Sequence, residues 1–491
     1  MTRLSQAAAL PPGVRTPAYD RAAHGEGIVH LGLGAFHRAH QAPYTEEALE
    51  AAGGDWRIVG VSLRSAAPAQ ALVPQDCLYT LAESGAEGTR LGVIGALSRA
   101  LAFAHGDGAA VRAALASPST RIVSLTVSEK GYGLDRATGG VDPGHPAIAH
   151  DLARPDAPVG VGGLLVRAIG ERRAAGIAPF AVLSCDNLPG NGRLVRSLLL
   201  DFAARTAPDL VDVIAGEVAF PSSMVDRITP APGPRVIAMV KAATGLYDAA
   251  AVEAEPFRQW VIEDAFPSGR PAWEAGGALL VSDVSAYERM KLRMLNGTHS
   301  MLAYAGHLSG RRTVRDVMAD DALARLVRRH MAAAAATLAP LDGVDFAAYA
   351  DDLSERFANP NIAHETCQIA MDGTEKLPQR IFAPALDTLD AGGDVSPFAF
   401  ATAAWMRHAL GRTDDGTAYP LRDPREEEIA ARLSGARGAA DVASALFSLP
   451  GLFPAALAAD DSFRAAVGRT LAFMLEAGMA AAVRREVECV R

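Results

Sequence analysis

Four residues in one stretch of the sequence, Glu288, Lys291, Asn296 and His299, are of types that together can move a proton and hold a reacting hydroxyl group. A lysine can act as a general acid or base, and an amide or an imidazole can donate hydrogen bonds to an oxygen whose charge is changing. Apolar residues at helical spacing predict a helix over residues 287–302. At about 100° per residue, Glu288, Lys291 and His299 would lie within roughly an 80° arc, with Asn296 about 60° further round.

The same arc of this predicted helix carries Leu295 and Leu302, which favour burial. Burying a lysine, an amide and an imidazole without partners costs several kcal/mol. The stretch is therefore either a solvated helix face with scattered leucines or a catalytic face whose polar groups meet a substrate. In the second case Glu288, one turn before Lys291, would pass the proton to solvent; in the first it is an ordinary surface glutamate.

A second amide, Asn187, follows an apolar run over residues 180–184 that is typical of a buried strand. Removing hydride from a secondary alcohol requires a base for the hydroxyl proton and donors for the developing oxyanion. Lys291 would be the base, and Asn187 and Asn296 would be the donors. His299 would bind a neighbouring substrate hydroxyl, which completes a metal-free site for hydride transfer.

Two other arrangements compete with this interpretation. Tyr287 and Lys291 copy the Tyr-x-x-x-Lys spacing of short-chain dehydrogenases, but they lie far later in the chain than in those enzymes, so we expect Tyr287 to be a packing residue. His37 and His40 are close enough in sequence to share a metal. No carboxylate or cysteine ligand is evident near them, so we expect no metal.

The glycines that would hold a cofactor come near the start of the chain, at Gly32 and Gly34. A short apolar run over residues 28–31 enters this Gly-x-Gly turn, and a helix-compatible stretch follows from about His37 to Ala52. Backbone amides at the start of a helix after such a turn hold the pyrophosphate of a dinucleotide. Because His37 occupies the position of the usual third glycine, the turn by itself is equally compatible with an ordinary strand–helix connection.

Strands and helices continue to alternate through the first half of the chain. Strands are predicted over residues 55–64, 121–127 and 180–184, and helices over residues 162–176 and 191–204. This alternation predicts an α/β fold with a doubly wound parallel sheet, which binds ligands at the carboxyl ends of its strands. From about residue 286 helical periodicity dominates. We therefore expect a Rossmann-type dinucleotide-binding domain over residues 1–285 and a mainly α-helical substrate-binding and catalytic domain over residues 286–491.

The composition is that of a globular protein. The 491 residues exceed what a single core usually supports, and 49% hydrophobic with 21% charged residues is an ordinary balance. A formal net charge of −9 argues against broad nucleic-acid binding. The four cysteines show no metal or redox spacing, and neither a signal peptide nor a membrane-spanning run is evident. We expect a cytoplasmic protein without nucleic-acid or membrane partners.

Five motifs, taken in order, resemble the polyol-specific long-chain dehydrogenases, the mannitol dehydrogenase family. They run from the glycine turn into the second half of the chain, so the resemblance is far more specific than any one motif. Within that family, residues 129–132 and 368–371 look more like fructuronate (mannonate) reductases than mannitol dehydrogenases. The motifs are GLGAFHRAHQ (32–41), SCDN (184–187), FPSSMVDRI (220–228), KLRMLNGTH (291–299) and DGTEKLPQR (372–380).

The resemblance implies a role for each matching residue. Lys291 would be the general acid/base, and Asn187 and Asn296 would hold the reacting oxygen. His299 and Asp226 would orient the substrate, and no metal would be needed. Glu288 would lie on the proton path. The residues implied in cofactor binding are Gly32, Gly34, Ala35, Phe36, His37, Arg38 and Glu129.

The resemblance also favours a substrate and a coenzyme. It implies interconversion of D-mannonate and D-fructuronate with NAD(H). A uronate carries a carboxylate, and Arg380, Lys376 or Lys130 would supply its cationic partner, unless each is only a surface charge or paired with a local acid. Residues 64–65 are Arg-Ser where an acidic residue would bind the ribose of NAD, which leaves NADP open.

Two alternative functions stay open at this point. The first is a polyol dehydrogenase that acts on D-mannitol and D-fructose or on D-arabinitol. The second is a non-catalytic protein that senses sugar and NAD, whose signature would be loss of Lys291 or of the asparagines, and all of these residues are present. We expect a small-molecule sugar acid or polyol as the ligand, and a monomer or a small homo-oligomer.

Overall fold

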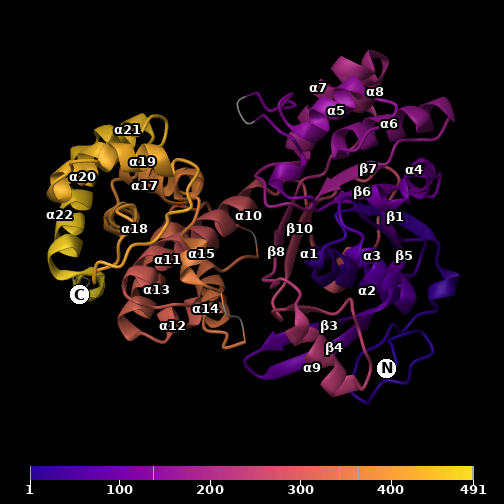
Figure 1. The fold of residues 1–491 in the computed structure, drawn as a ribbon, viewed down its shortest axis with the longest axis horizontal. Coiled ribbons are helices and arrows are strands. Elements are labelled where there is room, and N and C mark those ends of the chain that lie inside the picture. The colour runs from indigo at the N-terminus through magenta and orange to yellow at the C-terminus, as the bar shows by residue number, and fades with distance from the viewer. Residues whose placement is uncertain (1, 136–137, 342, 362–363, 489–491) are drawn as a thin grey trace. The chain divides into compact units, whose positions relative to one another are not determined.

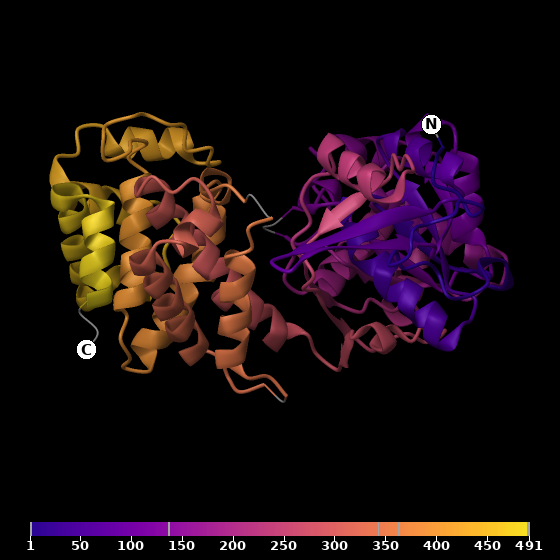
Figure 2. The same cartoon turned by 90° about the horizontal axis from the view of Figure 1, so that it is seen from below.

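The computed structural model describes residues 2–135, 138–341, 343–361 and 364–488. They form two compact units, one up to Ser285 and one from Ala286 onward (Figures 1 and 2). The first unit contains the β-strands, and the second is built from helices. The predicted α/β class with a mainly helical C-terminal part is therefore confirmed.

The centre of the first unit is a five-stranded sheet whose paired strands are all parallel, in the order β5-β2-β1-β6-β7. His30 on the central strand is in register with Gly60 on one side and Ser124 on the other. The chain order reverses on the two sides of the central strand, which is the doubly wound arrangement that the alternation predicted. The strands are β1 (Glu26–Leu31), β2 (Arg57–Ser62), β5 (Leu97–Ala102), β6 (Ile122–Leu125) and β7 (Ala181–Ser184).

Successive side chains of β1 enter two different cores, because strand side chains alternate between faces. Val29 and Leu31 pack in one core with α4, α6 and α7, which gather on one flank of the sheet in Figure 1. Ile28 packs in the other core with α2, Trp260 and Trp273. The helices are α1 (Ala35–Ala39), α2 (Gln41–Ala52), α3 (Ala67–Leu72), α4 (Gly108–Ala116), α5 (Pro146–Ala153), α6 (Val161–Ala174), α7 (Asn191–Thr206), α8 (Val211–Gly216) and α9 (Pro234–Thr244).

Two small sheets complete the first unit, and neither is predicted by the alternation of strands and helices. One has the order β4-β3-β9, with an antiparallel β3–β4 hairpin. The other has the order β11-β10-β8, in which β10 pairs antiparallel with β8 and parallel with β11. The strands are β3 (Tyr79–Gly85), β4 (Gly88–Ile94), β8 (Ser223–Asp226), β9 (Val252–Ala254), β10 (Gln259–Glu263) and β11 (Leu279–Val281).

The second unit is organised around α18, which is buried along nearly its whole length and packs against α11 and α22. A helix that is apolar on every face belongs in the middle of a helical domain. None of the described helices is long and apolar enough to cross a membrane. The helices are α10 (Ser285–Met290), α11 (Thr298–Leu308), α12 (Val314–Met318), α13 (Asp321–Ala336), α14 (Phe346–Phe357), α15 (Thr366–Ile369), α16 (Gly373–Leu377), α17 (Ala383–Asp390), α18 (Ser396–His408), α19 (Glu426–Leu433), α20 (Gly438–Phe447), α21 (Ala455–Ala459), α22 (Asp461–Ala477) and α23 (Met479–Glu488).

The helix predicted over residues 287–302 forms, but the prediction that it is a regular α-helix is wrong. A π-helical segment, η7 (Lys291–Gly297), separates α10 from α11. A π-helix closes hydrogen bonds to the fifth residue along and so has a wider turn than an α-helix. The 100° spacing that placed the four polar residues on one arc therefore does not apply across this segment.

Candidate active site

A groove lies at the carboxyl ends of β1, β2 and β6, where a doubly wound sheet binds its ligand. Its cavity volume is about 320 Å³. The residues just after each of the three strands contribute to it, together with the start of α6. The lining residues are Gly32, Leu33, Gly34, Ser62, Leu63, Arg64, Pro68, Thr126, Val127, Gly131, Ala147, Val159, Gly160 and Val161.

The Gly-x-Gly turn lines this groove, the nucleotide groove. Gly32 has a φ of +112°, and a Cβ at this position would lie 2.1 Å from the carbonyl oxygen of Thr126. Only glycine therefore fits between β1 and β6. Gly34 is exposed, with no side chain to block an approaching phosphate. This cradle fits the pyrophosphate of a dinucleotide.

His30, which the sequence analysis did not single out, holds the turn from beneath. Burial lowers the pKa of His30 to about 3, so its ring is neutral and carries one N–H. Because its Nε2 lies 3.2 Å from the carbonyl oxygen of Gly32, that nitrogen bears the hydrogen. Its Nδ1 then accepts from the hydroxyl of Ser124 at 2.8 Å. Thr126 joins the network, with its Oγ1 2.9 Å from Nε2 and donating to Gly32.

The side chains of His37 and Arg38 are buried rather than directed into the groove. The His37 ring stacks on that of His30 at 3.4 Å between centroids, and burial holds its pKa well below the usual value. Arg38 donates to the carbonyl oxygens of Gly34 and Ala250. Ala35 and Phe36, named with them, are half-buried, and the described residues of this turn that line the groove are Gly32, Leu33 and Gly34.

The residue before Asn187 has the clearer structural role at the end of β7. The carboxylate of Asp186 accepts from the backbone N–H of Val127 and of Ser128, each at 3.0 Å, and from the hydroxyl of Tyr132 at 2.7 Å. Asp186 thereby fixes the segment after β6. Asn187 itself is exposed.

Three further residues from the sequence analysis lie in the same unit. Asp226 ends β8 and is buried. Lys130 is exposed on a short 3₁₀ turn. The side chain of Glu129 lies outside the part of the chain that the structure describes.

In the second unit, Lys291 begins the π-helical segment η7 and is only 9% exposed. Glu288 lies half-buried in the preceding helix. Asn296 lies near the end of η7, half-buried, and its side-chain amide forms no hydrogen bond with the described residues. π-helical segments within helices occur frequently at functional sites.

His299, in the first turn of α11, is 8% exposed, and its Nε2 has no hydrogen-bond partner among the described residues. Its ring stacks on Phe357 at 4.4 Å and meets the edge of His364 at 5.6 Å. Burial, followed by the charges of His364, Arg356 and Arg380, holds the pKa of His299 well below the usual value. A neutral ring with an unpaired buried nitrogen is suited to bind a substrate hydroxyl.

Arg380 lies on a second π-helical segment, η8 (Pro378–Phe382), which contacts η7. Its Nη1 lies 3.4 Å from the carbonyl oxygen of Asn296 and 3.2 Å from the hydroxyl of Ser300. The two segments approach closely, since a Cβ at Gly297 would lie 2.7 Å from the carbonyl oxygen of Arg380. Among the described residues the Arg380 guanidinium has no carboxylate within ion-pair distance, and burial lowers its pKa.

Lys376 is more fully occupied than Arg380. Its Nζ donates to the carbonyl oxygens of Ile369 at 3.3 Å and Met371 at 2.5 Å, and lies 3.6 Å from a carboxylate oxygen of Asp372. Burial, followed by the charge of Arg380, lowers the pKa of Lys376. Of the two cations predicted in this unit, Arg380 is therefore the one without a carboxylate partner among the described residues, and the one better suited to bind an anion.

Arg356 and His364, which no sequence motif indicated, contribute to the electrostatic environment of His299. Both come from segments outside the five motifs, at the end of α14 and just before α15, so only the fold brings them together. Both ring nitrogens of His40, a candidate metal ligand, are engaged within the protein. Its Nε2 donates to the carbonyl oxygen of Gln259, and its Nδ1 accepts from the side-chain amide of Gln41. Within the described ranges, no group of three or more His, Cys, Asp or Glu residues is placed to hold a metal ion.

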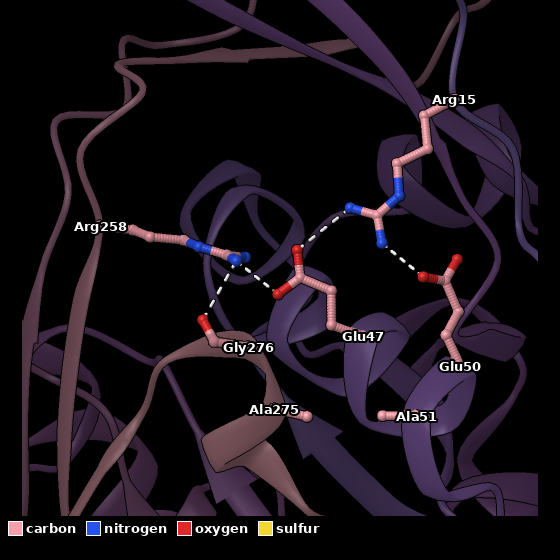
Figure 3. Close-up of a pocket in the computed structure, with 7 residues that line it drawn as sticks. All are labelled: Arg15, Glu47, Glu50, Ala51, Arg258, Ala275 and Gly276. Carbon is pink, nitrogen blue, oxygen red and sulfur yellow. Dashed lines mark hydrogen bonds and ion pairs between the residues drawn. The ribbon is translucent and has the colours of Figure 1, made fainter.

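A larger hollow of about 480 Å³ lies elsewhere on the first unit (Figure 3). In it Glu47 is held by both Arg15 and Arg258, and Glu50 pairs with Arg15. Arg258 also donates to the carbonyl oxygen of Gly276 at 3.1 Å. The two arginines and two glutamates neutralise one another, so this hollow is an ion-pair cross-link between α2, the N-terminal segment and the loop before β10.

Both units match models of known protein domains. Residues 26–275 match the mannitol dehydrogenase Rossmann domain, and residues 283–474 match the mannitol dehydrogenase C-terminal domain. The chain belongs to the mannitol dehydrogenase family. Membership in this family makes it an oxidoreductase.

Several relatives in the mannitol dehydrogenase family match nearly end to end. The chain is 42% identical to D-mannonate oxidoreductase of Escherichia coli, over 95% of this chain and 96% of that protein. It is 40% identical to mannitol 2-dehydrogenase of Cereibacter sphaeroides, over 84% of this chain and 86% of the relative. Among solved structures it resembles Pseudomonas fluorescens mannitol 2-dehydrogenase in a ternary complex with NAD and D-mannitol, with a TM-score of 0.85, 38% identity and 99% of each chain covered.

Proposed function

We propose that this protein interconverts D-mannonate and D-fructuronate with NAD(H), and that Lys291 is the acid/base. The observation that carries the proposal is the set of polar groups on η7 and the first turn of α11. A buried lysine is followed there by the Asn296 amide and the His299 Nε2, neither of which has a hydrogen-bond partner among the described residues. Buried polar atoms are normally paired, so the His299 Nε2 calls for the hydroxyl group of a ligand, and the half-buried Asn296 amide is free to bind another.

In this proposal the residues divide the work on a secondary alcohol. Lys291 takes the hydroxyl proton in oxidation and returns it in reduction, and Glu288 relays it towards solvent. Asn187 and Asn296 donate hydrogen bonds to the oxygen as its negative charge develops, which lowers the barrier most where charge changes most. His299 and Asp226 orient neighbouring hydroxyls. The nicotinamide cofactor supplies the hydride acceptor or donor.

The turn at Gly32 and Gly34 would hold the pyrophosphate of NAD, with backbone amides after Gly34 as donors. NAD is the cofactor in the ternary complex of the Pseudomonas fluorescens relative. The protein's own contribution at this end is positional, because His30 and Thr126 keep the turn in place from the strand side.

A uronate is favoured over a neutral polyol by the charge on η8. Arg380 is a largely buried guanidinium with no ion-pair partner among the described residues, and a guanidinium binds a carboxylate through two parallel hydrogen bonds. Its location beside the carbonyl of Asn296 ties it to the proposed catalytic segment. D-mannonate oxidoreductase of Escherichia coli, at 42% identity, is among the relatives of this chain.

The test compares NADH oxidation by the purified protein with D-fructuronate and with D-fructose. We expect a kcat/KM for fructuronate at least about 100-fold higher, because loss of a buried charged pair costs roughly 3 kcal/mol or more. Activity on fructose alone would refute the uronate assignment and favour the alternative, a polyol dehydrogenase acting on D-mannitol or D-arabinitol. Activity on neither ketose would favour a non-catalytic sensor.

A further inference from the structure

The end of β2 is the part of the nucleotide groove that would meet the adenosine ribose. In doubly wound folds an acidic residue at this position hydrogen-bonds the 2′-hydroxyl of NAD, whereas an arginine accommodates the 2′-phosphate of NADP. β2 ends at Ser62, and the next residues are Leu63, Arg64 and Ser65. Ser62, Leu63 and Arg64 line the groove.

No acidic residue is among the described residues that line this groove, and Arg64 is its one charged member. A carboxylate would attract the ribose hydroxyl and repel a phosphate carrying a charge of about −2. Without it, the groove lacks the feature that excludes NADP. The guanidinium instead supplies charge of the sign that a phosphate requires.

The backbone that carries Arg64 is anchored, while its side chain is available. Its carbonyl oxygen accepts a hydrogen bond from Nε2 of His105 at 2.9 Å. On the other side, the hydroxyl of Ser65 accepts from the backbone N–H of Ala67 at 3.1 Å, at the start of α3. The Arg64 side chain is exposed and forms no hydrogen bond or ion pair with the described residues. An arginine whose backbone is fixed and whose guanidinium N–H groups are unused can bind a phosphate through two parallel hydrogen bonds.

We propose that this groove admits NADP(H) as well as NAD(H), and that Arg64 binds the 2′-phosphate. The inference rests on the proposed function only in assuming that the groove binds a nicotinamide dinucleotide. It extends that function to a second coenzyme and names the residue that determines the selectivity. Ser65 contributes by leaving the position next to Arg64 without a negative charge.

The direct test is equilibrium binding of two fragments by isothermal titration calorimetry. The fragments are 2′,5′-ADP, which carries the 2′-phosphate, and 5′-AMP, which lacks it. We expect the wild-type protein to bind 2′,5′-ADP at least about 10-fold more tightly, as one charge-assisted pair provides. Arg64→Asp should abolish this preference and leave the affinity for 5′-AMP within about 2-fold, which also shows that the variant is folded.

Two further variants sharpen the comparison. Ser65→Asp keeps the arginine but adds a carboxylate beside it, so it should lower the affinity for 2′,5′-ADP while sparing 5′-AMP. Arg90→Gln removes an exposed arginine from β4, outside the groove, and should leave both affinities unchanged. Raising the salt concentration should weaken 2′,5′-ADP more than 5′-AMP, because only the former depends on the exposed charge pair.

The possible results distinguish the coenzyme inference, the role of Arg64 and the proposed function from one another. If the wild type oxidises NADH with a ketose but binds 2′,5′-ADP no more tightly than 5′-AMP, the coenzyme inference is overturned and the proposed function stands. If Arg64→Asp and wild type prefer 2′,5′-ADP equally, the role of Arg64 is overturned. If neither fragment nor NADH binds, the proposed function itself fails.

Discussion

At the scale of single residues, the chemistry proposed for this chain depends on what surrounds each polar side chain. Lys291, His299 and Arg380 are all largely removed from water, but His299 and Arg380 differ in their charge. The His299 ring is kept neutral by its surroundings, so it can donate or accept a hydrogen bond without adding charge. Arg380 stays charged, since a guanidinium does not lose its proton in a protein.

Replacing Lys291 by Met preserves the length and apolar stem of the side chain and removes its proton-transfer group. We expect kcat to fall by at least about 10²-fold, because a positioned acid/base contributes that much. NADH affinity, measured by fluorescence titration, should change little. Arg289→Ala, in the helix just before Lys291 and exposed, is the matched control and should keep normal turnover. A Lys291→Met protein with normal turnover contradicts the acid/base role.

Replacing Arg380 by Gln should raise KM for fructuronate by at least about 10-fold and change KM for fructose far less, because only the uronate loses a charged partner. Steady-state kinetics with the two ketoses measures this split. The matched control is Arg293→Gln, on η7, whose guanidinium already pairs with Asp387 at 2.6 Å. If both ketoses suffer equally from Arg380→Gln, the residue only joins η7 to η8 and is not a carboxylate partner.

At the scale of elements, the strand–turn–helix unit around Gly32 was predicted from the sequence, but the way it is held was not. The alternation of apolar runs predicts strands β1, β2, β6 and β7, because both faces of a parallel sheet are buried. It says nothing about His30, whose inward direction depends on the register with Ser124 on a strand far along the chain. Long-range register is the part of a fold that a local pattern does not contain.

His30 offers a test at this scale, because two substitutions mimic its two nitrogens. The amide nitrogen of Gln reaches the position of Nε2 and can still donate to Gly32, whereas Asn reaches only the position of Nδ1. We expect His30→Asn to raise the Kd for NADH about 5- to 10-fold, since it loses a hydrogen bond worth about 1 kcal/mol. His30→Gln should stay near the wild-type Kd, and kcat at saturating NADH should be similar in both.

That pattern distinguishes positioning of the turn from general structural support. If the two variants weaken NADH binding equally, or lower kcat at saturation together, His30 is only a core residue.

The helical unit was predicted in type but not in detail. Its periodicity indicates helices from residue 286 onward, and the proposed site residues Lys291, Asn296 and His299 were found by their types and spacing. The π-helical geometry of η7 was not foreseen, because no side-chain pattern distinguishes it from a plain helix. The residues around His299 come from separate helices, and only tertiary structure relates them.

At the scale of the whole molecule, the two units are separate compact bodies with different probes of their unfolding. Trp56, Trp260 and Trp273 lie in the first unit and Trp405 in the second. Tryptophan fluorescence therefore reports mainly on the unit that contains the nucleotide groove.

Glu46 makes the stability of that unit depend on pH. It is 2% exposed, accepts from the hydroxyl of Tyr19 and from the N–H of Gly95, and burial raises its pKa from 4.5 to about 7. A raised carboxyl pKa means that the folded state resists ionisation. The resulting cost is absent below pH 4.5, grows between pH 4.5 and about 7, and stays on the order of 3 kcal/mol at higher pH.

Glu46→Gln removes this cost, because an amide stays neutral at every pH. Urea unfolding followed by tryptophan fluorescence should show the variant to be more stable than wild type at pH 8 and little different at pH 5. Glu50→Gln on the same helix breaks an ion pair with Arg15 and should give no gain at pH 8. A Glu46→Gln effect of the same size at both pH values contradicts the ionisation argument.

The π-helical segment η7 has a consequence for the alignment of sequences and for protein engineering. A wide turn accommodates one residue more than a regular turn of the same rise, so deleting one residue between Lys291 and Gly297 would restore a continuous α-helix. Because the removed residue is the one that the wide turn takes up, the helix before the segment and the helix after it would stay nearly in phase. Such a deletion would leave the helix intact and the composition almost unchanged, yet it would remove the wide turn that carries Lys291 and Asn296. The length of this segment is therefore as much a part of the proposed active site as the residues within it.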